Sequence, residues 1–469
     1  MRVAVVTESF LPEVNGVTNS VLRVLEHLQR RGHQALVLAA VRGNPDAYAG
    51  ASVVRALSVP VPRYRSLSIG LPSPRFEAAL RLFRPEVVHL ASPVALGAHG
   101  AAVARRLAVP AVAVYQTDVA GFLARYGLGV AEPATWRWLQ RIHRRAALTL
   151  APSSQTVEAL ARHGITGVQV WRRGVDAERF HPRHRSPALR RRLAPGGEVL
   201  VYAGRLATEK RPEVAVAALA ELLDRWPRAR LVVAGSGPLA PRLATLAAGL
   251  PVTFLGFVAD RRELAALLAT ADVVLAPGPV ETFGLAALEA LASGTPVVVA
   301  RTGALPELLG PPVEASLSVP GRGASAGQAP QASPSPAGRG GPAGQAPQAS
   351  PSPPGHGAPE REGSPGPGGG SGAVHTPWTP GPAGGSGGHT PRTPGPGGGF
   401  GVVQWPDPTQ VGPGLAAHPV PSAMAEAVAA VLGWDPVERR ALARARAECF
   451  PWSATVAGML DVHRLEGRP

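Results

Sequence analysis

The sequence predicts an α/β protein with two Rossmann-like domains. Short apolar runs alternate with amphipathic stretches through the first half of the chain, as strands and helices do around a parallel sheet. After the polar stretch Arg183–Gly197 this alternation begins again, and near Glu314 it stops in a tract rich in proline, glycine and serine. Two β-α series joined by a polar link favour two Rossmann-like domains that face one another.

Each predicted element follows from an apolar run or an amphipathic stretch. The predicted strands are Val3–Val6, Ala35–Ala39, Val87–Leu90, Ala111–Tyr115, Leu148–Ala151, Val168–Trp171, Val199–Ala203, Arg230–Ala234, Thr253–Leu255, Val273–Ala276 and Pro296–Ala300. The predicted helices include Thr18–Arg30, Arg75–Leu82, Ala98–Leu107, Ala134–Arg145, Ser154–Arg162, Ser422–Leu432, Pro436–Glu448 and Ala454–Leu465. We therefore place the first domain at 1–182, a linker at 183–197, the second domain at 198–435 and C-terminal helices at 436–469.

The tract 314–399 is predicted to be a disordered insertion in a surface loop of the second domain. The segment AGQAPQASPSP occurs at 326–336 and again at 343–353. Such compositions cannot bury a core, and long surface insertions cost little stability. We favour an inert insert, and the sequence assigns it no role.

Composition and charge narrow the class of protein. The single cysteine, Cys449, excludes an internal disulfide, and the strand-like start and the lack of a long apolar segment predict a cytoplasmic protein. Residues 1–190 hold 25 arginines and 11 acids, a balance of +14, whereas the rest of the chain holds +1. A basic first half favours an anionic partner. No zinc-finger spacing, RNP-like run or Lys/Arg block is present, so we do not expect nucleic acid to be that partner.

A loop after the strand Val199–Ala203 carries the only lysine of the chain. Arg205 and Lys210 lie five positions apart on this loop, where a forked guanidinium and a point charge can converge on one diphosphate. The turn Gly235-Ser236-Gly237 follows the next strand; glycine allows a close backbone approach, although a lone turn of this kind is a weak signal.

The segment Pro277–Pro296 is the most specific of the chain. The loop acid Glu281 precedes Thr282-Phe283-Gly284-Leu285, where a helix begins, and a helix start with free N–H groups attracts anions. Glu289 lies eight residues beyond Glu281, roughly 12 Å away along a helix. The two acids can therefore hold opposite ends of an elongated ligand, with a diphosphate between them.

The E-x7-E segment, the strand–GR–x4–K loop and the two-domain layout resemble the retaining GT-B glycosyltransferases of family four. The resemblance implies that Arg205 and Lys210 bind the donor diphosphate and that Glu289 binds the donor ribose. It also implies that Glu281, Thr282, Phe283 and Gly284 contact the donor sugar. The main-chain N–H groups of Gly284 and Leu285 are implied to bind the donor diphosphate. The fold that it implies is GT-B, with a C-terminal helix that crosses back to the first domain.

The same resemblance places residues of the first domain in the site. It implies that Gly16, in the loop Glu8–Thr18, and Arg173 approach the donor diphosphate. Many relatives have a histidine at position 116, where this chain has Gln116, and an amide cannot act as an acid or base near neutrality. We therefore retain Gln116, Asp118 and Glu281 as candidate catalytic residues, with a helix N-cap as the alternative for Asp118.

No D-x-D pair for Mg²⁺ occurs in the sequence. We therefore expect no metal cofactor, with charge compensation at the leaving diphosphate supplied by Arg205, Lys210 and the helix start. Retention is often explained by attack on the same face as the leaving group, in which the departing phosphate takes the acceptor proton.

The donor and acceptor follow from the closer resemblance. YQTDVAGF, RYGLG and the closing FPWSATVAGML resemble GDP-mannose-dependent glycolipid and phosphatidylinositol mannosyltransferases of high-GC bacteria, which implies a nucleotide-sugar donor and a lipid-linked acceptor. A UDP-sugar donor (glucosyl, sulfoquinovosyl or N-acetylglucosaminyl) and a catalytically idle scaffold remain alternatives. A basic aromatic helix is expected to contact the inner, anionic face of the membrane. Alternatively, this helix packs on the protein and its basic face is simply solvated. Its residues are Trp136, Arg137, Trp138, Arg141, His143, Arg144 and Arg145.

Overall fold

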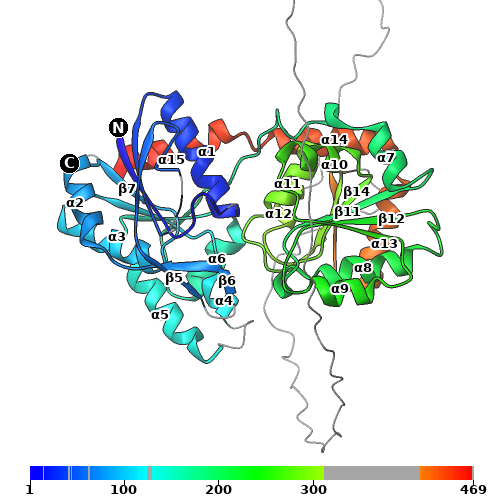
Figure 1. Ribbon diagram of the computed structural model, residues 1–469, viewed down its shortest axis with the longest axis horizontal. Helices are drawn as coiled ribbons and strands as arrows, with labels where there is room; N and C mark the ends of the chain where they lie inside the picture. Colours follow the sequence, from blue (N-terminus) through cyan, green and yellow to red (C-terminus); the bar gives the residue numbers. More distant parts are fainter. Residues whose placement is uncertain are drawn as a thin grey trace, which may run out of the picture. The chain divides into compact units, whose positions relative to one another are not determined.

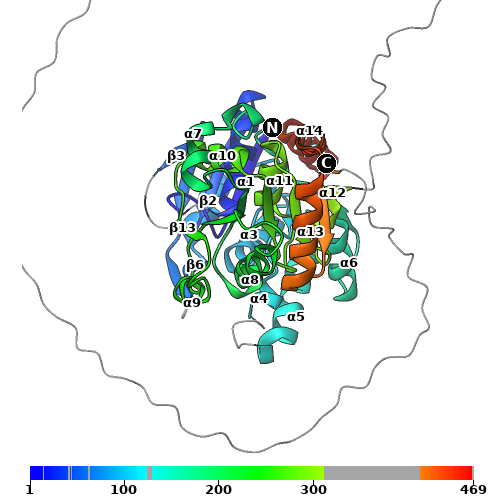
Figure 2. The same cartoon turned by 90° about the vertical axis from the view of Figure 1, so that its right-hand side faces the viewer.

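The computed structural model describes residues 1–13, 15–40, 43, 45–61, 64–123, 129–310 and 412–466. The tract 314–399 and most of the RYGLG motif lie outside these residues. Two parallel sheets dominate the described chain, each covered by helices on both faces (Figures 1 and 2). The α/β prediction with two Rossmann-like domains is confirmed.

The first sheet has the strand order β10-β9-β8-β7-β1-β2-β4-β3, parallel except for the pair β3 and β4. Its strands are β1 (Arg2–Thr7), β2 (Gln34–Ala39), β3 (Ala47–Tyr48), β4 (Ala51–Arg55), β7 (Val87–Leu90), β8 (Ala111–Val114), β9 (Leu148–Ala151) and β10 (Val168–Val170). The helices around it are α1 (Gly16–Arg30), α2 (Pro74–Phe83), α3 (Ala95–Arg106), α4 (Val119–Leu123), α5 (Glu132–His143) and α6 (Ser154–Arg162). A separate hairpin pairs β5 (Ser58–Val61) with β6 (Tyr64–Gly70).

The second sheet has the order β13-β12-β11-β14-β15-β16, and all of its pairs are parallel. Its strands are β11 (Val199–Ala203), β12 (Arg230–Ala234), β13 (Val252–Gly256), β14 (Val273–Ala276), β15 (Val297–Ala300) and β16 (Gly414–Ala417). Its helices are α8 (Pro212–Leu222), α9 (Ala240–Leu246), α10 (Arg261–Thr270), α11 (Leu285–Ala292), α12 (Pro306–Leu309), α13 (Pro421–Gly433) and α14 (Pro436–Glu448). The short α7 (Pro187–Leu193) lies in the predicted linker.

Layers of apolar side chains hold each sheet to its helices. In the first sheet, α1 and α15 (Trp452–Glu466) pack on one face and α2 and α3 on the other. In the second sheet, α8, α9 and α13 share one core, whereas α10, α11 and α14 share the core of the opposite face (Figure 1). Nearly continuous Val, Leu and Ala runs form these strands because a parallel sheet is buried on both faces.

The last helix, α15, returns to the first sheet, as the GT-B resemblance implied. Val456, Met459 and Leu460 join the core under α1. The indole Nε1 of Trp171 donates to the Thr455 carbonyl at 2.8 Å, and the guanidinium of Arg31 donates to the Ser453 carbonyl. The predicted domain limits, 1–182, 183–197, 198–435 and 436–469, remain predictions.

Two buried histidines connect α15 to the sheet. Nδ1 of His89, on β7, lies 3.3 Å from Nε2 of His463, and both rings are almost fully excluded from solvent. Burial lowers the pKa of His89 to about 4 and that of His463 well below its ordinary value. Both imidazoles are therefore neutral in the folded protein at neutral pH.

We expect this pair to make folding acid-sensitive. An unfolded histidine titrates near pH 6.5, so between pH 6.5 and about 4 the unfolded chain binds more protons than the folded one. The stabilisation is complete above pH 6.5 and is lost as the pH falls toward 4, by about 3 kcal/mol for His89 at ~1.36 kcal/mol per pKa unit. Urea unfolding at about pH 7.5 and about pH 5 measures the loss.

A double variant, His89→Leu with His463→Leu, provides the comparison. It removes these two titrating groups and leaves every other ionisable group in place, so it should lose less stability on acidification than the natural protein. Equal losses in the two proteins would show that the pair does not set the acid sensitivity.

Strands without a strong apolar signal escaped prediction. The elements β3 to β6 occupy residues 47–70, where short runs are interrupted by proline and polar residues. The edge strand β16 reads Gly-Leu-Ala-Ala, which has low strand propensity, and only its pairing with β15 makes it a strand. The predicted long strands and helices differ from those observed by at most a few residues at their ends, where prediction is weakest.

Candidate functional site

Two loops that carry predicted donor-binding residues meet at the carboxyl ends of β11 and β14. These two strands are neighbours although β12 and β13 lie between them in the chain, so the strand order reverses at this point. Ligands of open parallel sheets bind at such a reversal. The loop after β11 carries Arg205 and Lys210, and the loop after β14 carries Glu281. The fold therefore brings these three predicted residues to one edge of the sheet.

Lys210 forms an ion pair with Glu281, its Nζ donating to Oε1. Both side chains remain about a quarter exposed, so a ligand can reach them. The backbones approach closely: a Cβ on Gly278 would lie 2.9 Å from Cα of Lys210. Glycine is required there to keep the two loops together. The ion pair keeps the two side chains next to each other. The contacts of Lys210 with diphosphate and of Glu281 with sugar remain predictions.

The glycine turn 235–237 supports the Arg205 loop. The N–H of Leu206 donates to the Ser236 carbonyl at 3.0 Å. A Cβ on Gly235 would lie 1.8 Å from the Gly204 carbonyl oxygen, and one on Gly237 would lie 2.4 Å from the Leu206 oxygen. Any larger residue would push the loop away, so the turn fixes the loop on which Arg205 lies.

The start of α11 has the features of an anion site. Gly284 has φ of 95°, in the left-handed region, and within the described chain no side chain caps this helix. Thr282 is one of the residues before it, and its hydroxyl donates to the Gln116 carbonyl at 3.0 Å. The side chain of Phe283 is buried in the core against Phe450, so a contact of this residue with a ligand would involve its main chain. The predicted sugar contact of Phe283 remains a prediction.

Residues of the first sheet reach the same place. The guanidinium of Arg173, which is buried, donates to Oε1 of Gln116. A Cβ on Gly16 would lie 3.4 Å from Nη1 of Arg173 and 3.8 Å from Leu285 at the start of α11. Gly16, Gln116, Arg173 and Leu285, which the sequence separates widely, therefore form one cluster.

Asp118 immediately precedes the short helix α4. Its Oδ1 accepts from the Gly121 N–H at 2.9 Å and from the Tyr115 hydroxyl at 3.3 Å. These contacts are those of a helix N-cap, the alternative that the sequence left open. Its catalytic role remains a prediction.

Glu289, on α11, is buried beside a cation that the sequence did not single out. The guanidinium of Arg261 donates to Glu289 and also lies 4.9 Å from the centre of the Phe180 ring. Burial raises the pKa of Glu289, and Arg261 opposes that rise. Arg261 follows the helix-capping Asp260, and nothing in its local sequence distinguishes it from other surface arginines. The predicted ribose contact of Glu289 remains a prediction.

Nothing in the sequence indicated the contacts that two further glutamates make. Glu8, at the end of β1, accepts from the N–H groups of Gly70 (2.8 Å) and Leu96, and so connects the β5–β6 hairpin to the start of α3. Burial raises the pKa of Glu8 to about 7, although these N–H groups lower it. Glu307, on α12, accepts from the N–H groups of Ser154 (3.0 Å) and Gln155 (2.9 Å) at the start of α6. An isolated acid gives no sequence signal for either contact.

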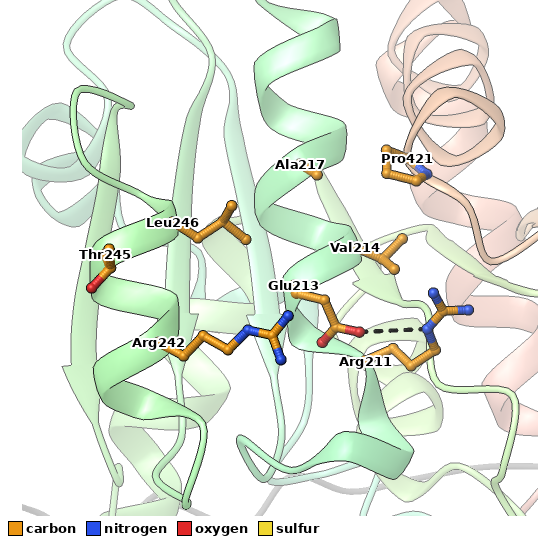
Figure 3. A pocket seen from close by; sticks show the side chains of 8 residues that line it. All are labelled: Arg211, Glu213, Val214, Ala217, Arg242, Thr245, Leu246 and Pro421. Carbon is orange, nitrogen blue, oxygen red and sulfur yellow. Dashed lines mark ion pairs between the residues drawn. The ribbon is translucent and has the colours of Figure 1, made fainter. Parts of the chain in front are cut away.

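A groove of about 530 Å³ lies on another part of the second domain. Val214, Ala217 and Leu246 form apolar parts of its lining, and Arg211, paired with Glu213 at 3.5 Å, and Arg242 extend beside it (Figure 3). None of the predicted site residues lines it. The groove is therefore distinct from the cluster around α11.

Two kinds of feature, a metal-ligand cluster and a membrane-spanning helix, are absent from the described residues. No group of three or more His, Cys, Asp or Glu side chains in those ranges is placed to hold a metal ion. No helix among the elements described is long and apolar enough to cross a bilayer.

Both halves of the chain are similar to known proteins. Residues 14–179 match the family described as Glycosyltransferase Family 4, and residues 197–328 match Glycosyl transferases group 1. A GDP-mannose-dependent α-mannosyltransferase of Mycolicibacterium smegmatis is 47% identical over 318 residues, 66% of this chain and 82% of the relative. The chain belongs to glycosyltransferase family four. The loops after β11 and β14 of this glycosyltransferase carry the residues that the sequence predicts to bind the nucleotide-sugar donor.

Two other proteins resemble this glycosyltransferase. A GDP-mannose-dependent α-(1-6)-phosphatidylinositol dimannoside mannosyltransferase of Mycobacterium tuberculosis is 52% identical over 153 residues, 32% of this chain and 40% of the relative. The solved sucrose-phosphate synthase of Thermosynechococcus elongatus superposes with a TM-score of 0.64 at 18% identity, over 99% of this chain and 98% of that one. The structural likeness confirms the GT-B fold.

Proposed function

We propose that the protein is an α-mannosyltransferase that moves mannose from GDP-mannose to a glycolipid acceptor. The observation that carries the transfer chemistry is the cluster of Lys210 and buried Arg173 at the uncapped start of α11. Two cations and the positive end of a helix can stabilise the negative charge that develops on a departing diphosphate. The mannosyltransferases to which the chain is similar are GDP-mannose-dependent, which supports GDP-mannose as the donor.

The proposed step transfers the sugar with retention. The bond from the mannose C1 to the diphosphate oxygen breaks as the bond from C1 to the acceptor oxygen forms on the same face. The acceptor proton passes to an oxygen of the leaving diphosphate, so no protein base is needed. Gln116 cannot titrate, and Oδ1 of Asp118 caps α4, which supports this assignment. NMR of the product tests it, since an inverted anomeric carbon would contradict it.

We propose that this transfer needs no metal ion. Lys210, Arg205 and Arg173 supply the charge compensation that Mg²⁺ provides in enzymes with paired carboxylates. Transfer should persist in excess EDTA, and a loss that is restored by Mg²⁺ or Mn²⁺ would contradict this part.

A donor screen tests the function directly. A ligand present at about 100 times its Kd stabilises the folded protein by about 2.7 kcal/mol. We expect GDP to raise the unfolding temperature and UDP at the same concentration to leave it unchanged, and labelled GDP-mannose to give a labelled product that extracts with lipid. Stabilisation by UDP alone would favour the UDP-sugar alternatives, and the absence of any transfer would favour the idle scaffold.

The acceptor class and membrane contact belong to the same proposal. On α5, Arg137, Trp138 and Arg141 are exposed, with Trp138 40% exposed. The predicted set of membrane-facing residues needs one correction. His143 is buried, and its Nδ1 lies 2.9 Å from the Thr149 hydroxyl, so it cannot face a membrane. A basic face with an exposed indole fits an anionic bilayer surface. Vesicles containing anionic lipid should retain the protein at moderate salt, and vesicles of neutral lipid should not.

A further inference from the structure

Gln116 lies between two polar groups that fix its side-chain amide. Oε1 accepts from Nη2 of Arg173, and Nε2 donates to the Ala91 carbonyl at 2.8 Å. A guanidinium can only donate and a carbonyl can only accept, so the amide has one permitted orientation. Its main-chain carbonyl is also engaged, by the hydroxyl of Thr282. The residue is only 6% exposed, so its side chain has little room for another rotamer.

Arg173 has a buried cation without a matching anion. The residue is 4% exposed, it forms no ion pair with any described residue, and its Nε has no hydrogen-bond partner in the described chain. Burial lowers the pKa of Arg173 to about 10, with the charge of Glu281 acting in the opposite direction, so the group stays charged at neutral pH. A buried charge is costly unless it is paired. The guanidinium lies next to Gly16 and Leu285, at the start of α11, where a bound ligand can supply the missing anion.

The chemistry of position 116 matters because of this cation. A carboxylate there would form an ion pair with Arg173 and compete with the ligand for the guanidinium. A protonated imidazole would repel it. A neutral amide accepts the hydrogen bond at every physiological pH and leaves the positive charge uncompensated. Glutamine is therefore suited to orient the guanidinium without neutralising it.

We propose that Gln116 is a positioning residue that holds Arg173 toward the donor diphosphate, and that it takes no part in proton transfer. This inference rests on the proposed glycosyl transfer. The diphosphate supplies the anion that Arg173 lacks, and the amide keeps the guanidinium in place before the donor arrives. Preorganised charge of this kind is most effective in a site shielded from water.

The variant Gln116→His gives a readout that a purely structural role would not move. A neutral imidazole can accept from Arg173, whereas a protonated one cannot. The charged groups around position 116 are Arg173, Glu281 (itself paired with Lys210) and Asp118, two residues along the chain. Relative to the natural enzyme, the variant should keep most activity at about pH 8 and lose about tenfold as the pH falls through the titration of the imidazole.

A second variant covers the case in which the first does not fold. Gln116→Glu should weaken GDP binding about tenfold, measured by calorimetry, because its carboxylate competes for Arg173. Gln169→Glu, on the exposed face of β10, makes the same change of charge and should leave GDP binding unchanged. A ratio of variant to natural activity that is flat with pH, together with unchanged GDP binding by Gln116→Glu, would overturn the inference. A natural enzyme that transfers no sugar would instead overturn the proposed function.

Discussion

Replacing Lys210 by alanine is expected to lower kcat/KM for the sugar donor by about 10²- to 10³-fold, the size of effect seen when one preorganised donor to a developing anion is removed. The lysine forms an ion pair with Glu281 beside the start of α11. Its loss removes a cation and also leaves the Glu281 carboxylate unpaired near an anionic ligand. Initial rates with labelled donor, at saturating acceptor, measure the effect.

The fold should survive this change because the Lys210 side chain is 27% exposed and belongs to no apolar cluster. Arg242→Ala, which removes an exposed cation from α9, is the matched control and should leave kcat/KM within about twofold. Adding Glu281→Gln to Lys210→Ala separates the two causes: the double variant regains part of the binding of GDP if the unpaired carboxylate contributes. Near-full activity in Lys210→Ala would contradict the assignment of the β11 loop.

Replacing Arg173 by methionine is expected to reduce transfer by about 10²-fold or more while the free energy of unfolding stays within about 1 kcal/mol or rises. Methionine removes a buried cation whose desolvation is not repaid by an ion pair in the described chain. It also leaves Oε1 of Gln116 without its donor, at a cost of about 1–3 kcal/mol. The loss of the buried cation and the loss of the donor to Gln116 have opposite effects on stability, whereas both lower the rate of transfer.

Arg439 provides the control for this variant. It is also 4% exposed, but its guanidinium donates to the Val431 carbonyl at 2.6 Å and lies 3.9 Å from Asp272. Arg439→Met should therefore lose about 3 kcal/mol of stability and keep its activity per folded molecule. Urea unfolding and initial rates on both variants complete the test. Strong destabilisation of Arg173→Met with unchanged specific activity would show that Arg173 is structural.

Much of the fold was predictable because its signals are local. The strand Val199–Ala203 and the helix Pro436–Glu448 were predicted with their observed ends, since apolar runs and helix caps lie within each segment. The loop with Arg205 and Lys210 was placed correctly after its strand for the same reason. The hairpin β5–β6 and the edge strand β16 were missed, since their conformation depends on partners elsewhere in the chain.

The sequence predicted candidate residues for the site, but it did not predict the contacts between them. Sequence motifs identified Lys210, Glu281 and Glu289, yet did not show that Lys210 pairs with Glu281 or that Arg261 pairs with Glu289. Phe283 belongs to a motif that is predicted to contact the ligand, but its side chain is buried in the core. Position within a motif fixes which loop a residue occupies, and packing decides the direction of its side chain.

The sequence by itself determined the two Rossmann-like domains, the loops that hold the candidate residues and the resemblance to family four, because periodicity and motif spacing are properties of neighbouring residues. Only the tertiary structure decided which charges meet. Gln116 and Arg173 are 57 residues apart, and Lys210 and Glu281 are 71 apart. Parallel strands bring their carboxyl ends to one edge of a sheet wherever they occur in the chain, so contacts between such residues are set by strand order.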